Sequence, residues 1–337
     1  MSVNESVTIL APGGRGGVAS TIEAVLPALG PDVRWVQTGR RAGERSAILA
    51  LLRSLAARPG SIVHLHTSLR GRSLARDAAL HLRARAAGAT TVVSFHGWSR
   101  AWADRVERWP ALRTLVRELL LSAHATTALT ADQDAALRRW GAREVTRIGN
   151  AWDPRAVATE RLPGPRTLLF LGRLVPEKRP GLLLDALAHL PADLEVVLAG
   201  VGPLEPELRI AATAFGDRVR LPGWLDADRR RDALARASVV VLPSEDEAMP
   251  VALLEALASG VPVVATPVGA IPELLDGLGV LVDPVSPEGL ARAIGTALNA
   301  ARDPEIGRRA RERASVFAPS SIAAAWRATY ERARAFR

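Results

Sequence analysis

Residues 243–265 read PSEDEAMPVALLEALASGVPVVA, and this stretch decides the fold of the second half of the chain. It follows the apolar run Val239–Leu242, which predicts a buried strand, and it ends in a second such run, Val261–Ala265. Between the two runs, Pro250 suits the first turn of a helix and Gly260 suits its C-terminal stop. Strand, helix and strand in succession indicate a parallel sheet covered by helices.

Two glutamates in this stretch stand apart from the other acidic residues. Glu247 lies in the loop before the predicted helix, whereas Glu255 lies inside the helix among apolar neighbours. A carboxylate in such a run is expected to be buried, and a buried carboxylate needs hydrogen-bond donors. The vicinal hydroxyls of a ribose are natural partners, as in dinucleotide sites. Glu245 and Asp246 fit the plainer role of helix-capping or exposed acids.

The same alternation of apolar strands and helices runs through both halves of the chain. In the second half, the predicted strands are Thr167–Leu171, Leu194–Ala199, Val219–Leu221, Val239–Leu242, Val261–Ala265 and Gly279–Val282. In the first half, they are Val7–Leu10, Val33–Val36, Ile62–Leu65, Thr91–Phe95 and Ala125–Leu129. Residues 161–165 break the pattern with two prolines and a glycine, and they are the best candidate for a linker. The sequence therefore predicts two doubly wound α/β domains, whose ligands bind beyond the carboxyl ends of the strands.

A basic loop follows the first strand of the second half. It contains Arg173 and Lys178 and leads toward a helix, whose free N–H groups and dipole favour an anion. Lys178 is the only lysine among the 44 Lys and Arg residues. A compact ammonium at one place in an arginine-rich chain indicates a specific oxygen contact. We expect these two cations to bind the phosphates of a diphosphate; an ordinary basic loop is the alternative.

Together these motifs resemble those of the family-4 retaining glycosyltransferases, which have the GT-B fold. The matching pattern is Gly172-Arg173-x4-Lys178 and Glu247-x7-Glu255-Ala256-x-Ala258-x-Gly260-x-Pro262-Val263-Val264-Ala265, and it extends through Gly269, Pro272-Glu273 and Gly279–Val282. The resemblance implies two facing Rossmann-like domains and a donor diphosphate that contacts Arg173 and Lys178. It also implies that Glu247 meets the transferred sugar and that Glu255 holds the ribose. Ala248 and Ala270 stand where the family often has glycine, and each adds a methyl group near the sugar.

The first half carries a looser form of the same resemblance. Gly16 and Gly17 follow the first strand and resemble the family's glycine loop, whose backbone N–H groups approach the donor phosphate. His96 follows the fourth strand, where the family commonly places a histidine near the reacting sugar; a structural histidine is the alternative. We expect His64 and His66 to be packing residues or residues of the acceptor cleft.

The resemblance also predicts the domain organisation. Residues 1–160 should form the acceptor-side domain, and residues 166–318 should form the nucleotide-sugar domain. Residues 319–337 resemble the helix that crosses back onto the first domain in this fold. Asn150 and Asp153 match the ends of the family's Asn-Gly-Val-Asp turn, whereas the two residues between them differ.

Composition restricts the remaining classes of function. The chain has 337 residues, no cysteine and a formal charge of +9, and the lack of cysteine excludes disulfides and thiolate metal sites. The positive charge suggests an anionic partner, but arginine bias also explains it, and no nucleic-acid motif is evident. No apolar run approaches the ~20 residues of a membrane span, and the N-terminus lacks the pattern of an export signal. We therefore expect a cytoplasmic protein.

Two further features have competing interpretations. Asp226 and Asp228 could form an acidic metal site, but a helix N-cap explains them more simply, so we expect a metal-independent reaction without a cofactor. Trp98, Trp102 and Trp109 lie among arginines, as in an interfacial membrane helix. A solvated helix with buried tryptophans is the equal alternative, so peripheral contact with the inner face of the membrane stays open.

The predicted function is transfer of a sugar, with retention of configuration, from a nucleoside-diphosphate sugar to a hydroxyl of a glycan, a glycolipid or a small molecule. Arg173 and Lys178 would stabilise the leaving diphosphate, while Glu247 and His96 would contact the sugar. The nearest alternative is a nucleotide-sugar hydrolase or epimerase of the same fold. The alternative from another class is a basic membrane- or nucleic-acid-binding protein, although we expect no nucleic-acid partner.

Overall fold

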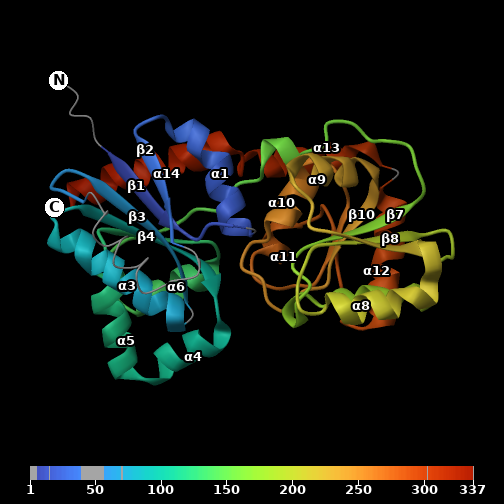
Figure 1. Cartoon of the computed structure of the whole chain (residues 1–337), viewed down its shortest axis with the longest axis horizontal. Coiled ribbons are helices and arrows are strands. Elements are labelled where there is room, and N and C mark those ends of the chain that lie inside the picture. Colours follow the sequence, from blue (N-terminus) through green and yellow to red (C-terminus); the bar gives the residue numbers. More distant parts are fainter. Residues whose placement is uncertain (1–5, 15, 39–56, 70, 302, 337) are drawn as a thin grey trace. The chain divides into compact units, whose positions relative to one another are not determined.

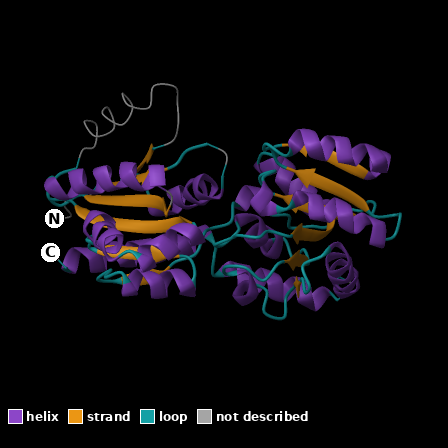
Figure 2. Ribbon diagram, turned by 90° about the horizontal axis from the view of Figure 1, so that it is seen from below, coloured by secondary structure: helices purple, strands orange, loops and turns teal. Residues whose placement is uncertain are grey.

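The computed structural model describes residues 6–14, 16–38, 57–69, 71–301 and 303–336. The described residues form two compact units, one from Met1–Ala151 together with Pro319–Arg337 and the other from Trp152–Ala318 (Figure 1). Each unit contains a parallel sheet, and Figure 2 shows the strands of each unit as a layer between helices. This arrangement confirms the two Rossmann-like α/β units that the alternating pattern predicts.

The sheet of the first unit has the strand order β2-β1-β3-β4-β5-β6. Its strands are β1 (Val7–Ala11), β2 (Val33–Gln37), β3 (Ile62–Leu69), β4 (Thr90–Trp98), β5 (Ala125–Ala128) and β6 (Val145–Arg147). Its helices are α1 (Gly17–Leu29), α3 (Gly71–Ala86), α4 (Arg100–Arg108), α5 (Pro110–Val116), α6 (Ala131–Arg139) and α14 (Pro319–Ala335), with a π-helical turn η1 (Arg117–Leu121) after α5. The sequence did not predict β6, because Thr146 and Arg147 leave no apolar run there.

The C-terminal helix α14 belongs to the first unit, as the resemblance implies. It lies beside α1, where Figure 1 shows the red helix next to the blue one. Its buried residues include Ile322, Trp326 and Tyr330, which recur at intervals of four and therefore form one apolar stripe. Arg327 donates a hydrogen bond of 2.7 Å to the carbonyl of Ala28 near the end of α1.

The sheet of the second unit has the strand order β12-β11-β10-β7-β8-β9. Its strands are β7 (Thr167–Leu171), β8 (Glu195–Ala199), β9 (Val219–Gly223), β10 (Ala237–Leu242), β11 (Val263–Ala265) and β12 (Val280–Leu281). Its α-helices are α7 (Pro180–Ala186), α8 (Glu205–Ala212), α9 (Ala227–Arg236), α10 (Val251–Ala258), α11 (Ile271–Leu274), α12 (Pro287–Ala300) and α13 (Pro304–Ser315). Leu168, Phe170 and Val239 are fully buried in its core, which explains why these strands read as continuous apolar runs.

The strand order of the second unit reverses between β7 and β10. From β7 the chain passes to β8 and β9 on one side, and it then returns to the other side of β7 with β10. Because β7 and β10 are parallel neighbours, the loops that follow them leave the same edge of the sheet side by side. Such a switch point is where doubly wound sheets bind their ligands. The two loops concerned are residues 172–179 and 243–250.

The boundary between the units lies nearer the N-terminus than the sequence indicates. The structure places it between residues 151 and 152 rather than at residue 160. The segment that follows packs on the second unit, since the N–H of Ala158 donates to Ser259 Oγ at 3.0 Å and that of Leu162 donates to the Ala235 carbonyl at 2.9 Å. Proline and glycine mark this segment as irregular, but hydrogen bonds decide to which unit it belongs.

Candidate active site

The loop after β7 carries the basic motif. β7 ends at Leu171, and a 3-10 turn η3 (Pro176–Lys178) precedes α7. The loop was expected to open directly into a helix, but the 3-10 turn intervenes, and Arg179 after it has a left-handed backbone with φ 46°. The first residue of α7 is Pro180, which has no N–H. The predicted anion contact would therefore depend on side chains of the loop more than on the dipole of α7.

Lys178 and Glu247 meet at the switch point of the second sheet. Lys178 Nζ donates a hydrogen bond to Glu247 Oε1, and the two side chains are 16% and 10% exposed. Ser244 Oγ donates to the same oxygen at 3.1 Å. The backbone also joins the two loops, since the N–H of Glu245 donates to the carbonyl of Glu177 at 2.8 Å. Two residues 69 positions apart in the chain therefore form one polar site.

A glycine allows the chain to pass close behind Glu247. Gly269 has φ +57°, and a Cβ at this position would lie 2.1 Å from the carbonyl oxygen of Glu247. The next residue, Ala270, donates its N–H to the carbonyl of Ala248 at 2.8 Å. Gly269 is therefore required both by its backbone conformation and by this close approach.

Arg173 is not drawn into the Lys178–Glu247 pair. Its side chain is 49% exposed and forms an ion pair with Glu177 at 3.3 Å within the same loop. An exposed pair of this kind contributes about 0–1 kcal/mol, so the guanidinium can exchange Glu177 for another anion at little cost. The structure thus brings Lys178 and Glu247 together and keeps Arg173 on the exposed side of the loop.

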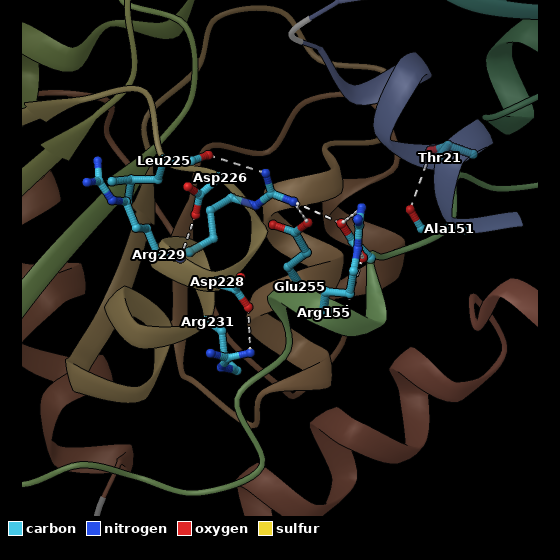
Figure 3. A network of polar contacts seen from close by, with 11 residues as sticks. Thr21, Ala151, Arg155, Leu225, Asp226, Asp228, Arg229, Arg231 and Glu255 are labelled. Carbon is cyan, nitrogen blue, oxygen red and sulfur yellow. Dashed lines mark hydrogen bonds and ion pairs between the residues drawn. The ribbon is translucent and has the colours of Figure 1, made fainter.

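Glu255 lies on α10 and is buried, as its apolar neighbours predict. Its side chain is 3% exposed, and Arg230 of α9 donates to it, with 3.1 Å between Nη2 and Oε1. The same Nη2 lies 3.5 Å from Oδ2 of Asp153. Figure 3 shows this polar network, with Glu255 beside Arg155. The partner of the buried carboxylate in this structure is an arginine, and the ribose contact stays a prediction.

The surroundings of Glu255 change its acidity. Burial raises the pKa of Glu255 to about 7; Arg230 opposes this shift, and the negative charge of Asp153 adds to it. A carboxylate that titrates near neutral pH can change its charge when a ligand binds, which is typical of functional sites.

Sequence reasoning missed Arg230, which stands between two other arginines. Its signal is helical spacing, because Arg230 precedes the buried Leu234 by four residues and so lies on the same face of α9. Its neighbour Arg231 is 44% exposed and pairs with Asp228 instead.

The two aspartates considered as metal ligands serve α9. Asp226 is the N-cap of this helix and accepts a hydrogen bond of 2.9 Å from the N–H of Arg229. Asp228 forms an ion pair of 2.9 Å with Arg231. In the part of the chain that the structure describes, no group of three or more His, Cys, Asp or Glu residues could hold a metal ion. The helix-cap interpretation of Asp226 is confirmed.

The glycine loop of the first unit leads from β1 into α1. Gly16 is the N-cap and has an extended backbone, and α1 begins at Gly17. Among the described residues, no heavy atom lies within 4 Å of the position that a Cβ of Gly16 would take. A ligand can therefore approach the backbone of this turn closely, as the phosphate-binding prediction requires.

A row of three histidines is buried in the first unit. His64 and His66 lie two residues apart on β3 and therefore on the same face of the sheet. His96 lies near the end of the neighbouring β4. His66 Nδ1 lies 2.6 Å from His96 Nε2, and their rings stack with centroids 4.7 Å apart. His64 forms hydrogen bonds with the Tyr330 hydroxyl of α14 at 2.8 Å and with Ser94 Oγ at 2.7 Å. His64 and His66 are packing residues in this structure, and both lie in one row with His96.

Hydrogen bonds define the state of His96. Its Nδ1 lies 3.0 Å from Oδ1 of Asn150, which can only accept, so Nδ1 carries the proton and Nε2 accepts from His66. Burial lowers the pKa of His96 to about 4 and that of His64 to about 3, and it lowers the pKa of His66 as well. The row is therefore neutral. A hydrogen bond between a His96 ring nitrogen and a sugar would require one of these two bonds to be exchanged.

The tryptophans that follow His96 divide between core and surface. Trp98 stacks on Trp140 with ring centroids 5.4 Å apart, and Trp102 packs against the same core. Trp109, between α4 and α5, is 62% exposed. Trp98 and Trp102 are thus partly buried against the core, whereas Trp109 is exposed, and the membrane contact stays a prediction. None of the helices in the described ranges has the length and apolar character needed to span a bilayer.

Both units match models of known protein families and have known relatives. Residues 4–151 match the glycosyl transferase 4-like domain, and residues 165–300 match glycosyl transferases group 1. The GDP-mannose-dependent alpha-(1-6)-phosphatidylinositol dimannoside mannosyltransferase of Mycobacterium tuberculosis is 30% identical over 307 residues, which are 81% of this chain and 77% of that protein. The D-inositol 3-phosphate glycosyltransferase of Streptomyces griseus is 37% identical over 194 residues, or 52% of this chain and 40% of that protein. Against several such relatives, the aligned part of this chain spans about two fifths of their length.

Solved structures with the same fold cover nearly the whole chain. HepE of Anabaena in complex with UDP-glucose superposes with a TM-score of 0.76 at 18% identity, over 97% of this chain and 99% of that one. The sucrose-phosphate synthase of Thermosynechococcus elongatus gives a TM-score of 0.78 at 18% identity, over 99% of this chain and 100% of that one. These likenesses establish the fold, while the family matches and the mycobacterial relative establish descent. The chain belongs to the family-4 glycosyltransferases and has their GT-B fold of two Rossmann-like units.

Proposed function

We propose that this chain transfers a sugar from a nucleoside-diphosphate sugar to an acceptor hydroxyl with retention of the anomeric configuration. The observation that carries the proposal is the pairing of Lys178 with Glu247 at the switch point of the second sheet. A cation suited to a leaving diphosphate and a carboxylate suited to sugar hydroxyls lie within one hydrogen bond of each other. Membership of the family supports the proposal, as does a neighbour of the same fold in complex with UDP-glucose.

Donor binding would exchange the partners of these side chains. Lys178 would leave Glu247 for an oxygen of the diphosphate, and Glu247 would turn to the sugar hydroxyls. Arg173 would exchange the exposed carboxylate of Glu177 for the other phosphate. Preorganised cations of this kind stabilise the charge that develops on the leaving group. Gly16 and Gly17 are the proposed backbone contacts to phosphate in the first unit, and His96 is its proposed sugar contact.

The proposed reaction needs no protein nucleophile. The bond between the anomeric carbon and the diphosphate oxygen breaks, and the acceptor oxygen bonds to the same carbon on the same face. The acceptor proton passes to an oxygen of the departing diphosphate. Because Arg173 and Lys178 neutralise the leaving group in this scheme, it requires no metal ion and no cofactor. Transfer should then continue in excess EDTA, and rescue of an inhibited enzyme by magnesium would contradict the scheme.

The acceptor is proposed to be a polyhydroxylated compound, either a glycan, a lipid-linked sugar or a small molecule. The names of two relatives support this range, because one concerns inositol 3-phosphate and the other a phosphatidylinositol dimannoside. For a lipid-linked acceptor we propose peripheral membrane contact through Trp109 and Leu115, which are 62% and 52% exposed. Flotation with anionic liposomes at low and high salt would test this contact, with Trp109→Ala as the comparison. Equal flotation of both proteins would contradict it.

The donor can be found by a thermal-shift screen over UDP-, GDP-, ADP- and dTDP-sugars, followed by turnover with and without acceptor. The proposal predicts product only when an acceptor is present, with the configuration retained. Release of free sugar at the same rate without an acceptor would favour a hydrolase of this fold instead. Arg166→Ala is a suitable control, because Arg166 is 48% exposed and pairs with Asp193 away from the switch point.

A further inference from the structure

Three charged side chains lie together beneath the surface of the second unit. Arg230, Glu255 and Asp153 are here called the Arg230 cluster. Figure 3 shows Glu255 within its network of polar contacts. The side chain of Arg230 is 15% exposed, and each carboxylate side chain is 3% exposed. Burial of charged groups is costly unless they are paired, and replacement by apolar residues is often neutral. One member of this cluster, Glu255, is the predicted ribose-binding residue, which gives the cluster a candidate functional reason.

The two carboxylates of the cluster differ in their partners. Asp153 also binds Arg155, with 2.9 Å from Nη2 to Oδ2 and 3.1 Å from Nε to Oδ1. Within the described ranges, Arg230 is the one cation that contacts Glu255. Loss of Arg230 would leave Asp153 paired and Glu255 without a cation, next to a second negative charge.

Arg230 also offers a hydrogen bond that the protein does not use. Its Nη1 lies 3.5 Å from the carbonyl of Leu225 and its Nη2 binds Glu255. Its Nε is buried and has no partner among the residues that the structure describes. A buried N–H without an acceptor is rare in native proteins, so this donor is available to an acceptor oxygen that the described residues do not supply.

We propose that Arg230 is a positioning residue of the donor site, whose contact with Glu255 favours the ionised carboxylate and aims it at the ribose of the nucleotide. An ionised carboxylate accepts hydrogen bonds from both vicinal hydroxyls, whereas a protonated one uses an oxygen as a donor. The Nε–H of Arg230 can donate to a hydroxyl oxygen, because a hydroxyl both donates and accepts. This inference rests on the proposed function, and it adds to the donor site a residue that lies outside the family motifs described above.

The test compares two adjacent arginines on α9. Arg230→Gln removes the cation from the cluster, and Arg231→Gln removes the same side chain from the exposed face, where it pairs with Asp228. UDP, GDP and their 2′,3′-dideoxy forms are titrated calorimetrically near neutral pH, and the ratio of the two Kd values measures ribose recognition. We expect Arg230→Gln to reduce this ratio about fivefold or more and Arg231→Gln to leave it unchanged.

The ratio separates positioning from a merely structural role. A structural role would weaken the binding of both nucleotide forms alike, and that result would overturn the inference. Tighter ribonucleotide binding without Arg230 would overturn it as well, because Arg230 would then compete with the ribose. Arg230→Lys keeps the charge and should recover part of the lost preference for the ribonucleotide. It replaces Arg230→Gln in the test if that variant does not fold. No ribose preference in the parent chain would instead overturn the ribose contact predicted for Glu255, while the proposed sugar transfer would be judged separately by turnover with and without acceptor.

Discussion

In the first unit the buried polar groups near the glycine-loop end of the sheet are neutral, and hydrogen bonds join His64, His66 and His96 to one another or to their neighbours. In the second unit a buried cluster contains a cation, with Arg230 between the carboxyl groups of Glu255 and Asp153. Both arrangements pair most of their buried polar atoms by different means, although His66 Nε2 and Arg230 Nε have no partner among the described residues. The histidines avoid charge by staying deprotonated, whereas the carboxylates keep a cation beside them.

Because of this difference, we expect a change of pH to shift the stability contributed by these groups in opposite directions in the two units. Burial lowers the pKa of His64 to about 3 and that of His96 to about 4, and it raises the pKa of Glu255 to about 7. Acid therefore forces charge onto groups of the first unit that exclude it. In the second unit, acid removes a charge from a carboxylate that burial already disfavours.

The largest expected effect is loss of stability of the first unit in acid. Four buried histidines have a pKa below the ordinary 6.5: His64, His66, His81 and His96. Between pH 6.5 and about 4 the unfolded chain binds protons that the folded chain does not. The free energy of unfolding therefore falls as pH falls, by about 1.4 kcal/mol for each histidine and pH unit. Glu255 acts oppositely between 4.5 and about 7, where stability falls as pH rises.

Native-state hydrogen exchange would measure this contrast strand by strand. At about pH 5, β3 and β4 should lose more protection than β7 and β10, relative to neutral pH. The variant His66→Gln should lower the pH dependence of the first unit by one proton. Equal loss of protection in both sheets would break the comparison.

The second largest effect concerns the charged site and its only lysine. Lys178→Ala should lower kcat by raising the activation barrier by about 3 kcal/mol or more. This is the scale of removing one preorganised donor to developing charge. Lys178→Arg keeps the charge but changes the shape of the head group, so it should recover only part of the rate. Steady-state turnover would measure both variants. Full activity of Lys178→Arg with near-normal activity of Lys178→Ala would place the lysine outside the reaction.

A smaller effect is expected for Glu255, and it would sharpen the contrast between charged and neutral groups. Glu255→Gln should weaken donor binding by about 1–3 kcal/mol. A carboxylate has two oxygens that can accept from the two ribose hydroxyls, whereas an amide has only one. Because the pKa of Glu255 lies at about 7, the donor affinity of the parent chain should rise as pH rises through neutrality. The variant should show no such rise in calorimetric titrations. An identical pH dependence in both proteins would assign the titration to another group.

The smallest effect belongs to the neutral row. Tyr330→Phe removes the hydroxyl that binds His64 at 2.8 Å and should lower the stability of the first unit by about 1 kcal/mol. Thermal denaturation would measure the loss. The matched control is Thr296→Val, which removes an exposed hydroxyl from α12 and should change stability by less than about 0.5 kcal/mol. No difference between the two variants would show that the row is held by packing alone.

Local patterns predicted much of the fold because they involve residues close in the chain. β7 matches the predicted strand Thr167–Leu171, since a buried parallel strand is a short run of apolar residues. The N-cap role of Asp226 was predictable because its hydrogen bond reaches only to Arg229. The strand β6 and the division after residue 151 were not predicted, because neither follows from a local run of apolar or turn-forming residues.

The candidate site was predictable in its residues and less so in its contacts. Lys178 stands out as a single lysine, and Glu247 and Glu255 stand out at the two ends of a nine-residue motif. Their presence in one unit followed from the family resemblance. The short turn before α7 and the ion pair that keeps Arg173 on Glu177 did not follow, since both depend on the backbone geometry of the loop.

By itself, therefore, the sequence determined the two α/β units, the family and the side chains able to carry the chemistry. Only the tertiary structure decided the partners of those side chains. Arg230 meets Glu255 across 25 positions of the chain, and Tyr330 meets His64 across 266. Which residues meet over such separations depends on the order of the strands and on which helix covers which face of a sheet, and neither is written in the pattern of neighbouring residues.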